Sequence, residues 1–148
     1  MKDKKTWVGY EIHRLDNAIK KKIDNKLRSD GLDEATMTNG WVLKYLYDNR
    51  DKEVYQKDME KHFHIGRSTV TGILKLMEQN ELVKRVSVKN DARLKRVILL
   101  PKGEEVHKMI DNAIFDTNKK IIKGITANEL ETLFDILNKI HNNINEEK

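Results

Sequence analysis

The sequence predicts a mainly α-helical fold with one small β-hairpin. Apolar residues recur at helical spacing over most of the 148 residues, which is typical of amphipathic helices. One stretch, from Leu82 to Leu100, is instead rich in β-branched residues on both sides of a turn-forming segment, a pattern that favours two paired strands. Glycine, proline and capping residues separate these segments. The length is enough for a domain with a sizeable core.

The helix expected over Arg67–Asn80 has two contrasting faces. Its apolar residues lie at positions i, i+3, i+4 and i+7, so this face should pack on a core: Val70, Ile73, Leu74 and Met77. The opposite face carries small, polar or basic residues: Ser68, Gly72, Lys75 and Gln79. A glycine inside a helix costs about 1 kcal/mol relative to alanine. Gly72 therefore suggests a polar partner that approaches the helix backbone closely, and a solvated face is the alternative.

A basic hairpin should follow this helix. Asn80 is expected to adopt the left-handed conformation that ends the helix. The strands are predicted over Leu82–Val88 and Arg93–Leu100, with Lys89–Ala92 as the turn. From Ile65 to Lys102 there are nine lysines and arginines against three acids, whereas the whole chain carries only +5. This concentration of positive charge indicates a surface that binds a polyanion.

A shorter helix is predicted before it, over Tyr55–Phe63, with Met59 and Phe63 facing inward. His64–Gly66 separates the two helices, which is the arrangement of a helix-turn-helix with Gly66 at the turn. Together with the hairpin, this order of elements is that of a winged helix-turn-helix. The full fold class is therefore mainly α with a small β-hairpin wing, flanked by long N- and C-terminal helices.

The N-terminal part should contain two helices. The first has an apolar stripe and is expected to end at Gly31, with Leu32 supplying the apolar contact that accompanies such an end. Thr36 or Thr38 is expected to cap the second helix, which should run to about Asn49. A loop over residues 50–53 follows. The stripe of the first helix comprises Ile12, Leu15, Ile19, Ile23 and Leu27.

Two further helices are predicted at the C-terminus. Pro101 suits the first turn of a helix that extends to about Ile121 and that Gly124 closes. Thr126 and Glu129 have the spacing of a capping box. The last helix then has a heptad-like apolar seam: Leu130, Leu133, Leu137, Ile140 and Ile144.

We therefore divide the chain into three parts: residues 1–34, an N-terminal dimerisation helix; residues 35–100, the DNA-binding lobe; and residues 101–148, C-terminal dimerisation helices. A winged-helix core needs only the middle part, so the terminal helices have apolar stripes left over. A second copy of the chain is the favoured cover. Packing of the first helix on the last within one chain is the alternative.

Several function classes are not supported by the sequence. There is no phosphate-binding glycine loop, no HExxH motif and no nucleophile elbow, so we expect no enzyme activity. The chain has no cysteine, which rules out a disulfide or a thiol switch. His62 with His64, and His107 with Asp111, each lack further local ligands, so no metal or cofactor is expected. No segment suits a signal peptide or a membrane span, which predicts a cytoplasmic location.

Specific residues carry a resemblance to a known family. The hairpin and the helix after it have a spaced signature that resembles the wing of the MarR family of bacterial winged-helix regulators, and the preceding helix resembles its recognition helix. The pattern departs at Leu100, where the family usually has a threonine that caps the next helix. The residues that carry the resemblance are Asp91, Ala92, Arg93, Leu99, Pro101, Lys102 and Gly103 in the wing, and Ser68–Thr71 with Leu82 and Val83 before it.

This resemblance implies a transcriptional regulator, most often a repressor, that acts as a homodimer formed by the terminal helices. It also implies a small aromatic or anionic effector bound between the dimerisation helices and the DNA-binding lobe. The candidate pocket residues are Trp7, Tyr10, His13, Trp41 and Tyr45. For these aromatic residues, core packing is the alternative role.

The expected partner is double-stranded DNA. From the helix, hydroxyl and basic side chains would enter the major groove: Arg67, Ser68, Thr69, Thr71 and Lys75. From the wing, Lys89, Arg93 and Lys95 would act, with Arg93 reaching the minor groove and Asp91 orienting it. A simple turn role for Asp91 is the alternative. At the level of function, a winged-helix module for protein contacts and a DNA-coating protein without sequence preference are the alternatives.

Overall fold

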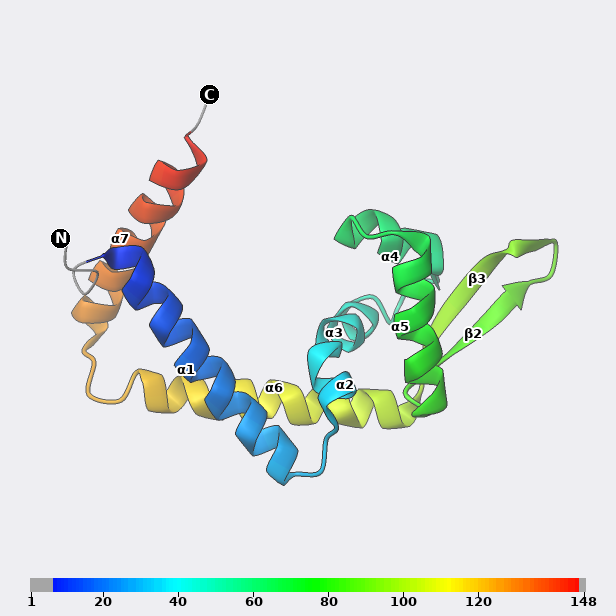
Figure 1. The fold of residues 1–148 in the computed structure, drawn as a ribbon, viewed down its shortest axis with the longest axis horizontal. Coiled ribbons are helices and arrows are strands. Elements are labelled where there is room, and N and C mark those ends of the chain that lie inside the picture. The colour runs from blue at the N-terminus through cyan, green and yellow to red at the C-terminus, as the bar shows by residue number, and fades with distance from the viewer. Residues whose placement is uncertain (1–6, 147–148) are drawn as a thin grey trace. The chain divides into compact units, whose positions relative to one another are not determined.

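The computed structural model describes residues 7–146, so the first six residues of the expected N-terminal segment and the last two of the C-terminal one lie outside the described part. The chain forms two compact units, divided between Ile114 and Phe115. The elements in chain order (Figure 1) are α1 (Val8–Ser29), α2 (Glu34–Thr38), α3 (Gly40–Asp48), β1 (Val54–Tyr55), α4 (Gln56–Phe63), α5 (Arg67–Gln79), β2 (Val83–Val88), β3 (Asp91–Leu99), α6 (Pro101–Ile121) and α7 (Ala127–Asn145). The predicted fold class, mainly helical with a small β wing, is confirmed.

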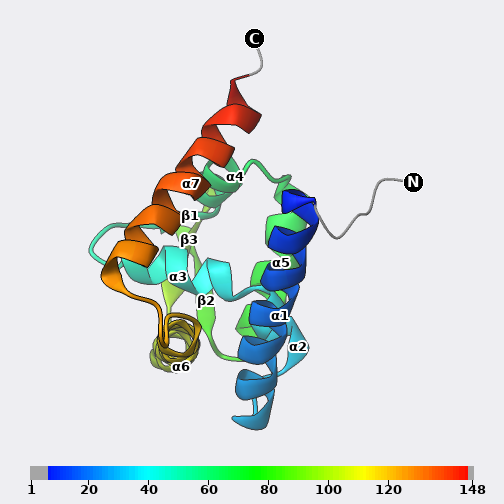
Figure 2. The same ribbon diagram turned by 90° about the vertical axis from the view of Figure 1, so that its left-hand side faces the viewer.

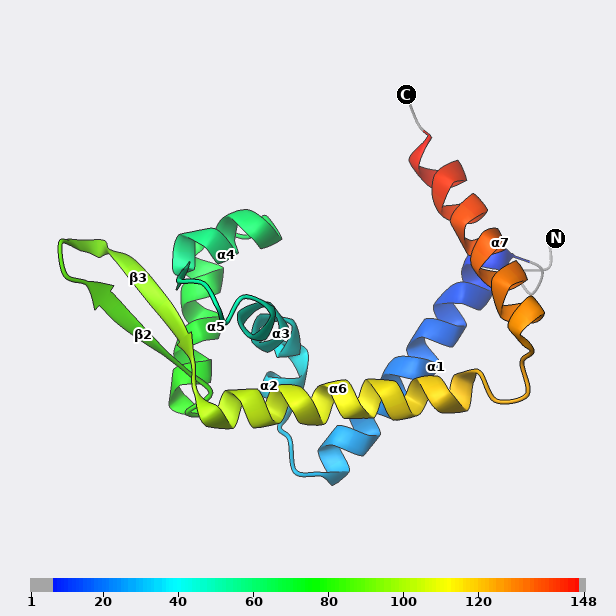
Figure 3. The ribbon, with the colours of Figure 1, turned by 180° about the vertical axis from the view of Figure 1, so that it is seen from behind.

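The sheet has three antiparallel strands in the order β1-β3-β2. Val88 pairs with Asp91, so the tip of the hairpin is the dipeptide Lys89 and Asn90. The pairing is irregular between Ser87 and Val88, close to this tip. Seen from behind, the hairpin extends away from the helices of the lobe (Figure 3). The hairpin was expected, whereas the short strand β1 was not.

The core of the first unit lies between α3, α4, α5, the sheet and the start of α6. The stripe predicted on α5 is confirmed, since Val70, Leu74 and Met77 are buried and Ile73 is half-buried. The sheet side of this core is β-branched or leucine, as strand propensity favours. The buried cluster comprises Val42, Leu43, Leu46, Val54, Met59, Val70, Leu74, Met77, Leu82, Val83, Val97 and Val106.

The end of α1 follows the sequence expectation. Gly31 has φ of 94°, a left-handed conformation that glycine adopts without the penalty of a Cβ atom. The N–H of Leu32 donates to the carbonyl of Leu27 at 3.1 Å and that of Gly31 donates to the carbonyl of Arg28 at 3.1 Å. These two bonds are the Schellman pattern. Along α1 only Leu27 is buried, and Leu15 remains 57% exposed.

The expected cap of the second helix is wrong. Neither Thr36 nor Thr38 starts it, because the segment splits into α2 and α3 and Asp33 caps α2 instead. The Asp33 carboxylate accepts the Thr36 N–H at 2.8 Å, and hydrogen bonding at Thr36 lowers the pKa of Asp33. Asp33 and Thr36 are both residue types that cap helices. Because Asp33 comes first and caps α2, Thr36 lies within that helix, where it is buried.

The left-handed residues around α5 also differ from the expectation. Asn80 has φ of −89°, whereas Glu81 has φ of 59°. The N–H of Leu82 donates to the Met77 carbonyl at 2.9 Å and that of Glu81 to the Glu78 carbonyl at 3.0 Å, so the Schellman turn is closed one residue later than expected. In the helix-turn-helix connection His64 is left-handed, while Gly66 is extended and is the N-cap residue before α5.

The start of α6 is packed closely against the end of α5. α6 is one continuous helix of 21 residues, seen end-on in Figure 2. A Cβ atom on Gly103, in its first turn, would lie 2.1 Å from the carbonyl oxygen of Leu82. That carbonyl already accepts the Leu100 N–H at 2.9 Å. Because this hydrogen bond holds the Leu82 carbonyl in place, the carbonyl cannot move away from an added Cβ atom.

We expect Gly103→Ala to lower the free energy of unfolding by about 1–3 kcal/mol, the usual range for overpacking. The clash outweighs the gain of about 1 kcal/mol in helix propensity. Urea denaturation measures this, and Gly72→Ala is the matched control, because a Cβ on Gly72 has no atom within 4 Å. Gly72→Ala should stabilise the protein by about 0.5–1 kcal/mol. Equal effects of the two substitutions would contradict the close packing at Gly103.

The second unit consists of the last part of α6 and of α7. The capping box is confirmed, since Thr126 Oγ1 accepts the Glu129 N–H at 3.2 Å and a Glu129 carboxylate oxygen accepts the Thr126 N–H at 2.9 Å. No residue of α7 is buried. Large apolar side chains of this helix are exposed: Leu133, Phe134, Ile136, Leu137 and Ile144. None of the helices in the described part of the chain combines the length and apolar character that crossing a membrane requires.

Candidate nucleic-acid interface

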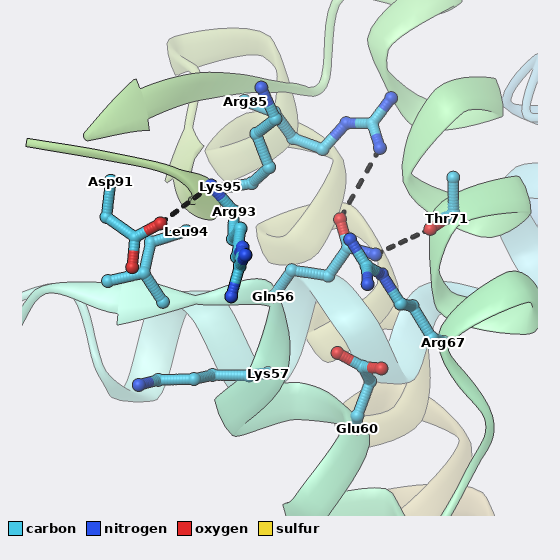
Figure 4. A pocket seen from close by; sticks show the side chains of 10 residues that line it. All are labelled: Gln56, Lys57, Glu60, Arg67, Thr71, Arg85, Asp91, Arg93, Leu94 and Lys95. Atoms are coloured by element: carbon cyan, nitrogen blue, oxygen red, sulfur yellow. Dashed lines mark hydrogen bonds between the residues drawn. The ribbon is translucent and has the colours of Figure 1, made fainter. Parts of the chain in front are cut away.

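A polar groove lies between α4, α5 and the wing. It encloses about 520 Å³, and Figure 4 shows side chains that reach it from all three elements. Five of its lining residues are basic and two are acidic, so the charge of the groove is positive. The lining comprises Lys57, Arg67, Arg85, Arg93 and Lys95, the acids Glu60 and Asp91, and Gln56, Thr71 and Leu94.

The first turn of α5 is exposed beside this groove. Arg67, Ser68 and Thr69 are all exposed, and Lys75 lies further along the same helix, also exposed. Gly66 precedes them and has no side chain to cap the helix. The N–H groups of the first turn and the positive end of the helix dipole are therefore available to an anion. This end of α5 suits contacts to phosphate oxygens and base edges.

Thr71 is placed differently from the other predicted α5 residues. It is half-buried, and its Oγ1 accepts a hydrogen bond from Gln56 Nε2 at 2.6 Å. Gln56 Oε1 in turn accepts from Arg85 Nη1 at 3.4 Å, and Arg85 Nε donates to Glu78 Oε1 at 2.6 Å. Figure 4 shows the first two of these bonds. The Thr71 side chain is thus directed toward Gln56 of α4.

Sequence reasoning did not single out Gln56, Lys57, Glu60 or Arg85 as site residues. Lys57 and Glu60 belong to the first helix of the helix-turn-helix and reach the groove only because α4 crosses beside α5. Arg85 had one signal in the sequence. Because strand side chains alternate, it shares the face of buried Val83, and a charged residue at an inward position needs a partner.

Asp91 shapes the wing turn through the backbone. Its Oδ1 accepts the backbone N–H of Arg93 at 2.9 Å, which is an Asx turn. We expected the carboxylate to orient the guanidinium of Arg93. The bond that the structure shows is to the main chain instead, so Asp91 acts on the conformation of the hairpin near its tip. Lys89 and Arg93 are exposed, and Lys95 Nζ donates to Ser87 Oγ at 2.6 Å.

The nominated ligand residues fall into two groups. Trp41 and Tyr45 of α3 contact Phe63, with ring centroids 4.4 and 5.2 Å apart, and Tyr45 also contacts His62 at 4.7 Å. Burial raises the pKa of the Tyr45 hydroxyl. Trp7, Tyr10 and His13 are exposed at the start of α1. Among residues 7–146, no ring contact joins these three to the α3 cluster.

The space beside Trp41 is small. It has a cavity volume of about 0 Å³ and is lined by apolar side chains that include Phe63 and Ile65. Pockets for drug-sized ligands usually enclose about 300–1,000 Å³. In this conformation, Trp41 and Tyr45 are therefore packed mainly as part of the lobe.

Comparison with known proteins agrees with this geometry. The model of the MarR family matches residues 36–94. The heme sensor protein PefR from Streptococcus agalactiae, solved with heme, is 23% identical with a TM-score of 0.74, over 95% of this chain and 96% of that one. A protein from Clostridium acetobutylicum assigned to the MarR family is 26% identical with a TM-score of 0.71, over 95% and 99%.

MepR, a transcription regulator of the Staphylococcus aureus multidrug efflux pump MepA, is 20% identical with a TM-score of 0.75, over 93% of this chain and 98% of that one. MepR has also been solved with DNA and with ethidium bromide. The helix-turn-helix with its hairpin defines the fold class as a winged helix. Over residues 36–94 the chain is similar to the MarR family, and over nearly its whole length it shares the fold of these solved regulators.

Proposed function

We propose that this protein is a ligand-responsive repressor that binds an inverted-repeat operator as a homodimer in the cytoplasm. The observation that carries the proposal is the basic groove between α5 and the wing, with its exposed helix start on one side and the wing arginine on the other. A concave surface with positive charge on three elements suits a phosphate backbone.

The two sides of the groove suit the two grooves of DNA. The major groove of B-DNA admits an α-helix, and α5 offers Arg67, Ser68, Thr69 and Lys75 on its exposed face. The wing tip, with Lys89 and Arg93, then reaches the adjacent minor groove, where arginine is favoured. The phosphate strand that separates these grooves would pass along the lining between them. MepR, which shares this fold, has been solved with DNA, and this supports DNA as the partner.

The terminal helices support a homodimer. Leu15 on α1 is 57% exposed, and α7 buries none of its residues, although both helices have apolar stripes. Exposed apolar seams of this kind mark association surfaces, and the seam on α7 has heptad-like spacing. We therefore keep the three parts proposed from sequence, residues 1–34, 35–100 and 101–148, as dimerisation helix, DNA-binding lobe and dimerisation helices.

A small effector is the second part of the proposal. PefR was solved with heme and MepR with ethidium bromide, two ligands with aromatic ring systems. The aromatic residues nominated here, Trp41 and Tyr45 in the lobe and Trp7 and Tyr10 on α1, would supply stacking surfaces for such a ligand. Because the space at Trp41 has a cavity volume of about 0 Å³, effector binding would require these side chains to move.

The wing gives a direct prediction. We expect Arg93→Ala to weaken operator binding by about 1–3 kcal/mol, the range for a well-placed groove contact. Asp91→Ala should weaken it less, because it relaxes the turn that presents Arg93 and removes no DNA contact. The double substitution should cost less than the sum of the two. Fluorescence anisotropy at fixed salt measures all four proteins, and Arg93→Ala with wild-type affinity would refute the role of the wing arginine.

Selection of duplexes from a random library tests the proposed function itself. A two-fold dimer should enrich an inverted repeat whose half-site centres are about 10 bp apart, one helical turn. Tight binding to the library without enrichment of any sequence would indicate a DNA-coating protein. No binding at low salt would indicate a winged-helix module for protein contacts.

A further inference from the structure

A chain of polar contacts joins the helix-turn-helix to the wing, and three of its four members line the groove. It runs from Glu78 at the end of α5 to Arg85 on β2, then to Gln56 at the start of α4, and returns to α5 at Thr71. We call these four residues the polar bridge. Its bonds measure 2.6 Å at Glu78, 3.4 Å between Arg85 and Gln56, and 2.6 Å at Thr71.

The polar bridge is largely shielded from solvent. Gln56 is only 7% exposed, and the side chains of Arg85 and Glu78 are 20% and 32% exposed. Water therefore competes less for these groups than at the surface. The distances to Glu78 and Thr71 are short enough for well-formed bonds. The bridge also connects residues 15 and 29 positions apart in the chain, so it constrains tertiary arrangement and not local helix structure.

Arg85 is the centre of this arrangement. Its Nε is bonded to Glu78 and one Nη to Gln56, so the planar guanidinium is held between α5 and α4. The short bond to Glu78 fixes the position of the group, and the longer contact with Gln56 at 3.4 Å limits its rotation. β2, which carries Arg85, is thereby held at a set distance and angle from α5.

This distance matters because α5 and the wing must enter neighbouring grooves of the same duplex. If the wing could move relative to α5, part of the binding free energy would be spent on ordering the wing. The protein would then bind its operator less tightly. Non-specific binding depends mainly on total charge and tolerates an altered angle. A device that fixes the angle should therefore affect binding to the operator more than binding to other DNA.

We propose that the polar bridge is a positioning device that determines operator specificity by fixing the wing against α5, with Arg85 as its central positioning residue. This inference rests on the proposed function. Thr71, which lies on α5, then belongs to the polar bridge and not to the DNA contacts. Glu78 then favours operator binding, although it is an acid beside a surface that binds DNA.

Glu78→Gln gives the sharpest test because two physical effects have opposite signs. The substitution keeps the shape of the side chain and removes one negative charge. If only charge mattered, DNA binding would become tighter. The positioning role predicts weaker operator binding, by about 2- to 100-fold, with binding to a scrambled duplex unchanged or tighter.

Arg85→Lys separates positioning from direct binding of a phosphate. Lysine keeps the positive charge but cannot bond to Glu78 and Gln56 with one planar group. The positioning role predicts a lower ratio of operator to scrambled affinity and an unchanged dependence of affinity on salt. If Arg85 instead neutralised a phosphate, a lysine would do the same, and the ratio of operator to scrambled affinity would keep its wild-type value. Gln56→Leu, which changes no charge, should reproduce the loss of specificity.

Lys84→Ala is the matched control. Lys84 is the neighbouring basic residue on β2, and because side chains alternate along a strand it lies on the opposite face from Arg85. It should leave the ratio of operator to scrambled affinity unchanged. Circular dichroism with thermal unfolding selects a temperature at which every variant is folded, and the isosteric Glu78→Gln keeps the test available if Gln56→Leu does not fold.

The outcomes are distinct. Weaker operator binding in Glu78→Gln together with a reduced ratio in Arg85→Lys supports the inference. Equal or tighter operator binding in Glu78→Gln, or a wild-type ratio in Arg85→Lys, overturns it. A wild-type protein that does not distinguish the selected operator from the scrambled duplex would instead refute the proposed function on which the inference rests.

Discussion

Operator affinity should fall by about 10³- to 10⁵-fold when the salt concentration rises from about 50 to 200 mM. This is the expected loss when roughly 6–10 phosphates are neutralised and their counterions are released. Each protomer offers basic side chains from three elements in the groove, including Lys57, Arg67 and Arg93, with Lys75 and Lys89 exposed beside them. A dimer doubles this number.

Anisotropy titrations at several salt concentrations measure the slope of affinity against salt. Lys57→Ala should reduce the slope by about 0.9 for each phosphate that Lys57 neutralises in the wild-type complex. Lys139→Ala on α7, outside the lobe, is the control and should leave the slope unchanged. A flat salt response of the wild-type protein would contradict an electrostatic DNA surface.

Charge on the seam of α7 should produce the second large effect. Leu133 and Leu137 are 43% and 39% exposed in the single chain, and the proposed homodimer buries them. Leu133→Glu combined with Leu137→Glu should convert the protein to a monomer at micromolar concentration, because buried unpaired carboxylates are strongly unfavourable. A monomer holds one half-site only, so operator affinity should fall by two orders of magnitude or more, roughly the avidity of a bivalent binder.

Sedimentation analysis and anisotropy measure the two consequences in the same samples. Asn138→Glu lies outside the seam and should leave the dimer intact. A monomeric wild-type protein at micromolar concentration would count against the homodimer. A charged-seam variant that remains a dimer would assign the interface to other residues.

The parts of the fold set by local sequence were predictable. The stripe of Val70, Leu74 and Met77 is confirmed as a core face because helical periodicity places all three on one side. Gly31 and the capping box at Thr126 act within a few residues, so their signals are also complete in the local sequence.

The parts that depend on distant residues were not predictable. β1 has two residues and exists only because Val54 pairs with Val97, far along the chain. The polar bridge likewise joins Gln56 to Thr71 and Arg85 through the packing of α4 and the wing. Periodicity therefore identified an exposed polar face on α5, but it could not show that Thr71 turns inward.

Cleavage of the operator by a probe on the wing tip tests the central claim most directly. The chain has no cysteine, so Asn90→Cys gives a single attachment point for an iron chelate that generates hydroxyl radicals. Asn90 lies in the hairpin tip between β2 and β3. Asn138→Cys on α7 provides the matched control.

We expect cuts from the Asn90→Cys probe to be confined to the minor groove flanking each half-site, with two-fold symmetry about the operator centre, and no such cuts from Asn138→Cys. Uniform cleavage along the duplex, or cuts from the α7 probe with none from the wing, would contradict DNA binding through the groove between α5 and the wing.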